Sequence, residues 1–477
     1  MSSSESALVS PREHAPPASW LAQIRGALRG EHYDYTAGPV GTALLLLAVP
    51  MVLETLMESL FAVCDVFFVG RLGADAVSTV GLTESMLTIL YALAMGLSIG
   101  ATATVARRIG EQDPEGAARA AVQSIALGLA VSVAVGVVGA LSAPALLRAM
   151  GASPSIIETG STYTRVMLGG NATVVLLFLV NAAFRGAGDA VIAMRVLWLA
   201  NGLNIVLGPC LVFGLGPFPE LGVTGAAVAT NIGRGTGVLF QLWNLAQPGR
   251  RLHVARRHLR LDLAVMRGIW RLSSTGVFQI LISTSSWVFL VRILSAFGSA
   301  VVAGNTIGIR LIIFAMLPAW GLANAAATMV GQALGARRPE RAARAAWMAA
   351  GYNVVFLGSI SVAFYALAYP IVGIFTAEPE VTAHAVECLR TVGIGFALFA
   401  VGMTLSSALN GAGDTWTPTW INLGCFWCFE IPLAFVLARP LGWGPEGVYA
   451  AITVAFVVHA LVCMALFRRG TWMTRAV

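Results

Sequence analysis

The sequence contains no lysine, so all 30 of its basic residues are arginine. A nucleotide-binding Walker A loop needs a lysine to reach the phosphates. Retinal and pyridoxal cofactors attach to a lysine as a Schiff base. These two kinds of site are excluded. If the chain moves a solute uphill, the energy must come from an ion gradient or from another subunit.

Charged residues are also scarce. They make up 11% of the 477 residues, against 57% apolar residues, whereas a soluble protein has about 25% charged residues. Long apolar runs recur between residues 40 and 467, and they are continuous rather than alternating. Such runs indicate spanning helices and not a barrel. The sequence therefore predicts an all-α, polytopic membrane protein in a lipid bilayer, without a nucleic-acid partner.

Hydropathy predicts twelve transmembrane helices of roughly 20 residues or more. They lie at 41–69, 79–106, 118–147, 161–184, 191–213, 222–246, 268–296, 300–333, 343–374, 384–409, 416–437 and 446–467. Most arginines fall in alternate loops and in the two tails, as in GARRPERAAR. Because positive residues are retained on the inner side, both termini are expected in the cytoplasm, with the chain in a bacterial inner membrane.

An internal repeat divides the chain. GLSIGATATVARRIGEQDPEGAARAA begins at Gly96 and GLANAAATMVGQALGARRPERAARAA at Gly321, 225 residues later. The tetrapeptide GAGD returns at the same distance, at 186–189 and 411–414. Two pseudo-symmetric six-helix lobes in the same orientation are therefore expected. Two lobes that rock about a central site are typical of a transporter.

The predicted domains follow from this division. They are a cytoplasmic tail with an interfacial helix (1–38), an N-terminal lobe (39–247), a basic cytoplasmic linker (248–271), a C-terminal lobe (272–467) and a second cytoplasmic tail (468–477). In the first tail Trp20, Leu21, Ile24 and Leu28 share one helical face. A solvated tail is the alternative.

The first predicted span carries three carboxylates, Glu54, Glu58 and Asp65. At 100° per residue all three lie within about 40° of one another, along roughly 16 Å of helix axis. A charge at the centre of a bilayer costs at least about 2.5–3.5 kcal/mol, so this stripe must face protein or water. A carboxylate there can load a proton or bind Na⁺. Either glutamate could instead be a structural clamp between helices.

The repeat provides a comparison for these acids. Positions 54, 58 and 65 correspond to Gln279, Ser283 and Leu290, so the second half lacks all three carboxylates. Ion coupling is therefore expected in the N-terminal half, while Gln279 and Ser283 are candidate residues of the substrate cavity. Glu430, in the eleventh span, is a candidate contact for a substrate cation, with a structural role as the alternative.

The chain resembles the multidrug and toxic compound extrusion (MATE) family, in a DinF-like branch of its superfamily. The resemblance lies in Pro50 to Asp65 with FFVGRLG, in the two long repeated stretches, in FRGAGD and NGAGD, and in NIVLGP. It implies export of cationic or neutral amphipathic compounds in exchange for H⁺ or Na⁺ by alternating access, without a cofactor and as a monomer.

Single residues can be carried over from this resemblance. Asp65 matches the helix-1 aspartate of the family and is a possible Na⁺ ligand, and Asn204 matches the helix-5 asparagine. Asn181 and Thr230 are looser matches to polar residues of the N-lobe cation site. The family's usual carboxylates are replaced at three positions. These positions are occupied by Gly208, Ser283 and Ala400.

Because Gly208 stands where the helix-5 carboxylate is expected, we hypothesise that Glu54 and Glu58 replace that group. Two other functions are open. One is a flippase for a lipid-linked precursor, which would need several arginines in its cavity, whereas only Arg234 and Arg310 lie deep within predicted spans. The other is an intramembrane aspartyl protease, whose Gly-x-Gly-Asp signature fits GAGD, but both copies fall in predicted turns.

Overall fold

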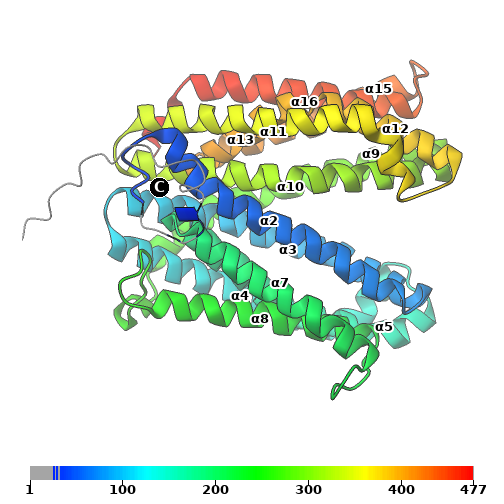
Figure 1. The fold of residues 1–477 in the computed structure, drawn as a ribbon, viewed down its shortest axis with the longest axis horizontal. Helices are drawn as coiled ribbons and strands as arrows, with labels where there is room; N and C mark the ends of the chain where they lie inside the picture. The colour runs from blue at the N-terminus through cyan, green and yellow to red at the C-terminus, as the bar shows by residue number, and fades with distance from the viewer. Residues whose placement is uncertain (1–24, 27, 29, 31–32, 476–477) are drawn as a thin grey trace, which may run out of the picture.

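The computed structural model describes residues 25–26, 28, 30 and 33–475, without the side chains of residues 62–67, 70 and 74. Each secondary-structure element in this part of the chain is a helix (Figure 1). The interfacial helix predicted within residues 1–38 falls almost entirely outside the described residues.

The helices form two groups. The N lobe consists of α2 (Val40–Gly70), α3 (Ala74–Gly110), α4 (Pro114–Ala149), α5 (Pro154–Gly169), α6 (Asn171–Ala187), α7 (Ala190–Phe213) and α8 (Val223–Ala246). The C lobe consists of α9 (Leu263–Leu294), α10 (Ser299–Gly335), α11 (Pro339–Gly373), α12 (Pro379–Ile394), α13 (Phe396–Gly411), α14 (Trp416–Asn422), the π-helix η3 (Leu423–Glu430), α15 (Ile431–Ala438) and α16 (Pro445–Arg468). Three short 3₁₀ helices complete the description: η1 (Arg256–Leu259), η2 (Ser295–Phe297) and η4 (Thr471–Thr474).

These elements agree with the predicted spans. In the described residues ten helices are long and apolar enough to cross a membrane, or eleven when α12 and α13, bent by 58° at Gly395, count as one span. The predicted span 161–184 is the pair α5 and α6. Helix α8 has the length of a span, but Thr230, Arg234 and Gln241 reduce its hydropathy. The twelve-helix, two-lobe fold class is confirmed.

The backbone repeats the sequence symmetry. Gly73 and Gly298 precede α3 and α10 with φ of 100° and 113°. Gly188 and Gly413, in the two GAGD turns, have φ of 87° and 86°. A residue with a Cβ rarely adopts such angles, so glycine is required at both copies of each turn. The two lobes are therefore built from the same turns at corresponding places.

The lobes meet most closely at the end that carries the C-terminus, which we call the basic end because arginines gather there. A Cβ on Gly110 of α3 would overlap the carbonyl of Gln332 on α10, and one on Gly335 would overlap that of Arg107. The amide of Gln332 also donates to the carbonyl of Gly186, at 2.8 Å. From this end the two lobes diverge toward the opposite end (Figure 1).

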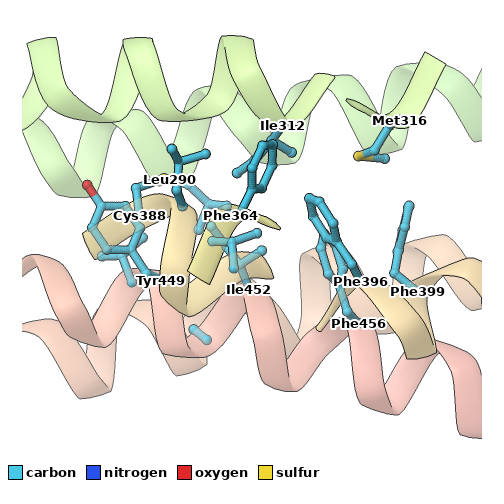
Figure 2. Packing of buried hydrophobic residues seen from close by; sticks show 14 of the residues in the cluster. Leu290, Ile312, Met316, Phe364, Cys388, Phe396, Phe399, Tyr449, Ile452 and Phe456 are labelled. Carbon is cyan, nitrogen blue, oxygen red and sulfur yellow. The ribbon is translucent and has the colours of Figure 1, made fainter. Parts of the chain in front are cut away.

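Buried apolar side chains hold each lobe together. In the C lobe, Phe396 and Phe399 of α13 lie beside Phe456 of α16 (Figure 2). Leu290 of α9 and Ile312 of α10 belong to the same buried cluster. The rings of Phe399 and Phe456 have centroids 4.2 Å apart. This packing fixes how α13 and α16 lie against α9 and α10.

Candidate functional site

Glu54 lies at the centre of a hydrogen-bonded network in the N lobe. It is buried on α2, and its Oε1 accepts from Arg185 Nη1 at 2.7 Å and from Asn181 Nδ2 at 3.1 Å, both on α6. Asn181 Oδ1 in turn accepts from Gln241 on α8 at 2.7 Å. A buried carboxylate needs such partners because an unpaired buried charge is costly. Glu54 therefore joins α2 to α6 through an ion pair, and Asn181 extends the network to α8.

Glu58 has a looser environment one helical turn later. Its Oε2 accepts from Asn201 Nδ2 of α7 at 2.9 Å, and its Oε1 lies 3.7 Å from Arg234 Nη2 of α8. The Glu58 side chain is 29% exposed, against 5% for Glu54. Because its ion pair is longer and its carboxylate reaches solvent, Glu58 is the glutamate that a proton or a cation can approach.

Arg234, the partner of Glu58, is held by aromatic groups. Its side chain is only 4% exposed, and its Nη1 donates to the Tyr91 hydroxyl at 3.0 Å. Its guanidinium lies 5.7 Å from the centre of the Phe61 ring and 5.8 Å from that of Tyr91. Ring faces attract a cation, so the positive charge of Arg234 keeps favourable contacts when Glu58 is neutral.

A neutral layer lies beside these pairs. Asn204 of α7 donates to the Thr230 hydroxyl of α8 at 2.8 Å, and both side chains are buried. Asn204 stands one turn after Asn201, the residue of α7 that donates to Glu58. The structure thus brings together Glu54, Asn181 and Arg185, and separately Asn204 and Thr230. Asp65 belongs to α2, but its side chain lies outside the described part.

The corresponding place in the C lobe is polar but uncharged. Ser283 of α9 accepts from Asn422 Nδ2 at 3.0 Å, and Asn422 Oδ1 lies 3.3 Å from His459 Nε2 of α16. The His459 ring stacks on Phe426, with centroids 5.2 Å apart. Gln279 is buried, and its Oε1 has no hydrogen-bond partner among the described residues. Ser283 therefore belongs to a hydrogen-bonded chain between helices.

Glu430 is the deep acid of the C lobe. It ends the π-helix η3 and is 2% exposed. Within the described residues its carboxylate has no hydrogen bond and no ion pair of the kind that Glu54 makes with Arg185. Its surroundings differ from those of Glu54 and Glu58.

Sequence reasoning missed several partners in these clusters, among them Arg185, Asn201 and His459. Arg185 lies in the last turn of α6, just beyond the predicted span, and binds the buried Glu54. Hydropathy ended this span at residue 184, one residue before the charge. Helical spacing provides a signal, since Arg185 stands four residues after Asn181 on the same face.

A protein-family model described as MatE matches the chain twice, over residues 50–210 and 276–436. Together the two matches cover more than half of the chain, one in each lobe. The chain belongs to the MatE family. The resemblance predicted from its motifs is confirmed. MatE proteins are transporters and not enzymes, so the aspartyl-protease alternative is excluded.

Known relatives extend along nearly the whole chain. The "Probable multidrug resistance protein NorM" of Thermotoga maritima is 27% identical over 447 residues, covering 91% of this chain and 93% of that protein. The "FAD transporter" of Shewanella oneidensis is 24% identical, with 92% and 97% covered. A structure titled "Outward-facing conformation of a multidrug resistance MATE family transporter of the MOP superfamily" superimposes with a TM-score of 0.85 at 27% identity, with 94% and 98% covered. This chain is a multi-pass membrane transporter similar to drug exporters.

One position of this MatE chain bears on the replacement hypothesis. Gly208 on α7 stands where the family resemblance places a helix-5 carboxylate. A Cβ added there would meet the Phe68 ring at 3.7 Å and Asn204 Oδ1 at 3.8 Å, which are ordinary contact distances. Space for a side chain therefore exists beside Asn204.

Proposed function

We propose that this chain exports cationic or neutral amphipathic compounds in exchange for H⁺ or Na⁺, by alternating access of its two lobes. The observation that carries the proposal is the half-open ion pair of Glu58 and Arg234, 3.7 Å apart, beside Asn201. An exchanger needs a carboxylate that is paired with a cation but not sealed from solvent, and the contacts of Glu58 meet both conditions.

Exchange follows from competition for that carboxylate. A proton on Glu58 removes its charge, and a substrate cation or Na⁺ can instead bind the charged form. One carboxylate cannot serve both ligands at once, so loading one favours release of the other. Arg234 stays in place through Tyr91 and Phe61. The arginine is therefore a partner for the Glu58 carboxylate that a ligand can displace, and its aromatic contacts keep it in the site afterwards.

Glu54 takes a different part in this proposal. Its bond to Arg185 is short at 2.7 Å, and both side chains are mostly sealed from solvent. Removing either partner of such a pair leaves an uncompensated buried charge. We therefore assign Glu54, with Arg185 and Asn181, to holding α2 against α6, and Glu58 to exchange.

Asp65 remains the third proposed member of the coupling site, from its place on the same face of α2 and from the family resemblance. Asn204 and Thr230 provide neutral oxygen and amide groups between α7 and α8, suited to an ion that passes along α2. Hard cations such as Na⁺ prefer oxygen ligands of this kind. Gln279, Ser283 and Glu430 are proposed to line the substrate cavity from the C lobe.

The orientation and the state of the transporter are part of the proposal. The arginine-rich loops support a basic end in the cytoplasm of a bacterial cell, with both termini inside. The lobes are packed at that end and diverge at the other, which supports an outward-facing state (Figure 1). We propose a monomer, since one chain contains both lobes and the whole polar site. The domain boundaries at 39–247 and 272–467 remain part of this proposal.

Purified protein in vesicles tests the function. A pH gradient and a Na⁺ gradient are imposed separately, and export of a fluorescent organic cation is followed. We expect one of the two gradients to drive export, and Glu58→Gln to flatten the dependence of export on that gradient. Export that ignores both gradients would overturn the exchange mechanism. Transfer of a lipid-linked pyrophosphate between leaflets, without export of the cation, would instead favour the flippase.

A further inference from the structure

Residues 33–38, which we call the N-terminal strap, cross the basic end just before α2 begins. Tyr35 lies at its centre and is only 6% exposed. Its hydroxyl donates to the carbonyl of Gly188 in the N lobe at 3.3 Å. The guanidinium of Arg251, which follows α8, lies 5.1 Å from the centre of its ring. The strap is therefore seated on the N lobe through one aromatic side chain.

Three arginines bind the backbone of the strap. Arg251 donates to the carbonyl of Tyr33 at 2.8 Å. Arg338, which precedes α11, donates to the carbonyl of Thr36 at 2.6 Å. Arg341, in the first turn of α11, donates to three more carbonyls, those of Tyr35, Ala37 and Gly38, at 3.0, 2.6 and 2.7 Å. Hydrogen bonds from a charged donor are stronger than neutral ones.

These arginines come from different lobes. Arg251 follows the last helix of the N lobe, whereas Arg338 and Arg341 begin a helix of the C lobe. The apolar contacts of Tyr35 also bridge the lobes, because its cluster includes Leu44 of α2 and Met329 of α10. All of these bonds form together only while the two lobes keep the relative position seen at the basic end.

We propose that the N-terminal strap is a lock that holds the basic end closed, and that it must release the arginines of one lobe before that end can open. Rocking of the lobes separates the N terminus of α11 from the loop that follows α8. A strap of six residues bound to both cannot follow this motion with all its bonds intact. The lock therefore adds to the stability of the closed basic end.

The strap is also continuous with the helix that carries the carboxylates. Pro39 joins Gly38 to α2, and Glu58 lies 18 residues beyond Val40, about 27 Å along the helix. Release of the strap frees the start of α2, so this helix links the lock with the site proposed for exchange. This link rests on the proposed function, whereas the lock itself does not.

The contacts of the strap are not expected to change with pH in the physiological range. Asp34 Oδ1 accepts from the backbone N–H and the hydroxyl of Thr36, at 2.9 and 2.6 Å, and so shapes the turn. Partial burial raises the pKa of Asp34, but these bonds and the nearby Arg251 and Arg338 outweigh it and hold the pKa below its usual value of 3.8. A carboxylate with a depressed pKa stabilises the fold fully above its usual pKa, and loses that contribution as the pH falls through the lowered pKa. The lock is therefore expected to be constant between about pH 5 and 8.

The test measures the opening of the basic end directly in the full-length chain. Spin labels are placed at Arg119→Cys on α4 and Glu340→Cys on α11, both exposed, after replacement of the native cysteines. Arg338→Gln with Arg341→Gln should add a population at longer distance, raising the open fraction several-fold. The matched control is Arg337→Gln with Arg344→Gln, which removes two exposed arginines from the same segment without removing a hydrogen bond to the strap, and should leave the distances unchanged.

A second pair of variants tests whether the strap itself is responsible. Tyr35→Ala and Arg251→Gln act on the same contact, so their combined effect on the open fraction should be smaller than the sum. Tyr35→Phe, which keeps the ring and loses the bond to Gly188, is a milder variant if Tyr35→Ala does not fold. Native distances in all strap variants would overturn the lock. Because no gradient is applied, that result would leave the proposed exchange function intact.

Discussion

The two lobes place different chemistry at the same positions of one repeated fold. Glu54 and Arg185 of the N lobe form an ion pair, whereas the repeat-equivalent residues, Gln279 and Asn410, are both neutral. Each of these amides has an oxygen without a hydrogen-bond partner among the described residues. The acid and the base of this pair are present together in one lobe and missing together from the other.

The second ion pair, Glu58 with Arg234, is also absent from the C lobe as a whole. Glu58 corresponds to Ser283 in the repeat. Gly222 and Gly444 precede α8 and α16 with φ of 56° and 60°, and counting from them puts Phe456 where the N lobe has Arg234. A buried charge without its partner costs several kcal/mol, which explains why each pair is charged on both sides or on neither. The architecture requires contact between helices here, and only the N lobe makes that contact ionic.

Neutralising the acid that both the buried stripe and the family resemblance select should have the largest effect. Asp65→Asn is expected to abolish gradient-driven export, because Asp65 is the position at which the family resemblance places the coupling carboxylate, and to leave insertion intact. Leu290, its counterpart in the C lobe, provides the matched control as Leu290→Asn. The measurement is export in vesicles, and full activity of Asp65→Asn would remove the difference between the lobes.

Breaking one ion pair should destabilise the N lobe strongly. Glu54→Gln leaves Arg185 buried without its partner and is expected to cost about 3–5 kcal/mol. Arg185→Asn should cost a similar amount. The double variant copies the C-lobe pair, Gln279 and Asn410, and should recover most of the loss. Thermal unfolding in detergent measures this, and a double variant as unstable as the single ones would contradict the paired rule.

Neutralising the exposed glutamate should change coupling more than stability. Glu58→Gln removes the group proposed to exchange ligands, so the pH dependence of export should flatten while the melting temperature falls by only a few degrees. Ser283→Ala in the C lobe is the control, expected to keep the pH profile. If Glu58→Gln keeps the native profile and Glu54→Gln loses it, the roles proposed for the two glutamates are reversed.

Moving the carboxylate between helices should rescue part of the activity. The space beside Gly208 accommodates Asp, so Gly208→Asp in the Glu58→Gln background should restore some proton-driven export. In the native background the same change should slow export, because like charges crowd together and hold a proton too tightly. The measurement is export across pH in the native, Glu54→Gln and Glu58→Gln backgrounds, each with and without Gly208→Asp. Rescue in neither glutamine background, Glu54→Gln or Glu58→Gln, would show that the α2 glutamates do not replace a helix-5 acid.

The smallest effect is expected in the C lobe. Glu430→Gln keeps the shape of a residue that has no ionic partner in the described structure, so the pH profile should be retained and the apparent affinity for an organic cation should weaken by a few-fold. Vesicle assays at several substrate concentrations separate the two effects. A lost pH dependence would place coupling in the C lobe and so end the asymmetry between the lobes.

The sequence predicted the spans, the repeat and the stripe of acids because each depends on composition and period alone. It could not predict the partners of those acids, since Arg185 and Asn201 come from helices whose packing is decided by the whole fold. Hydropathy even ended the fourth span one residue before Arg185, because it treats a charge as a boundary. A charge that is paired in three dimensions does not end a helix.

The strap was beyond sequence reasoning for a related reason. The tail was expected to be solvated or to lie on the membrane, and its residues 33–38 carry no pattern that names a partner. The three arginines bind the backbone carbonyls of these residues, and every residue has such a carbonyl. Only the arrangement of Arg251, Arg338 and Arg341 around them identifies the segment. Such a site can be predicted only from coordinates.

The π-helix of the eleventh span, Leu423–Glu430, sets the direction of its last residue. A π turn holds more residues than an α turn, so α14 and α15 on either side do not share the phase of one continuous α-helix. A one-residue deletion within this stretch would turn Glu430 and α15 relative to α14. The spacing of the chain here, and not only the choice of residues, therefore decides which way this acid points.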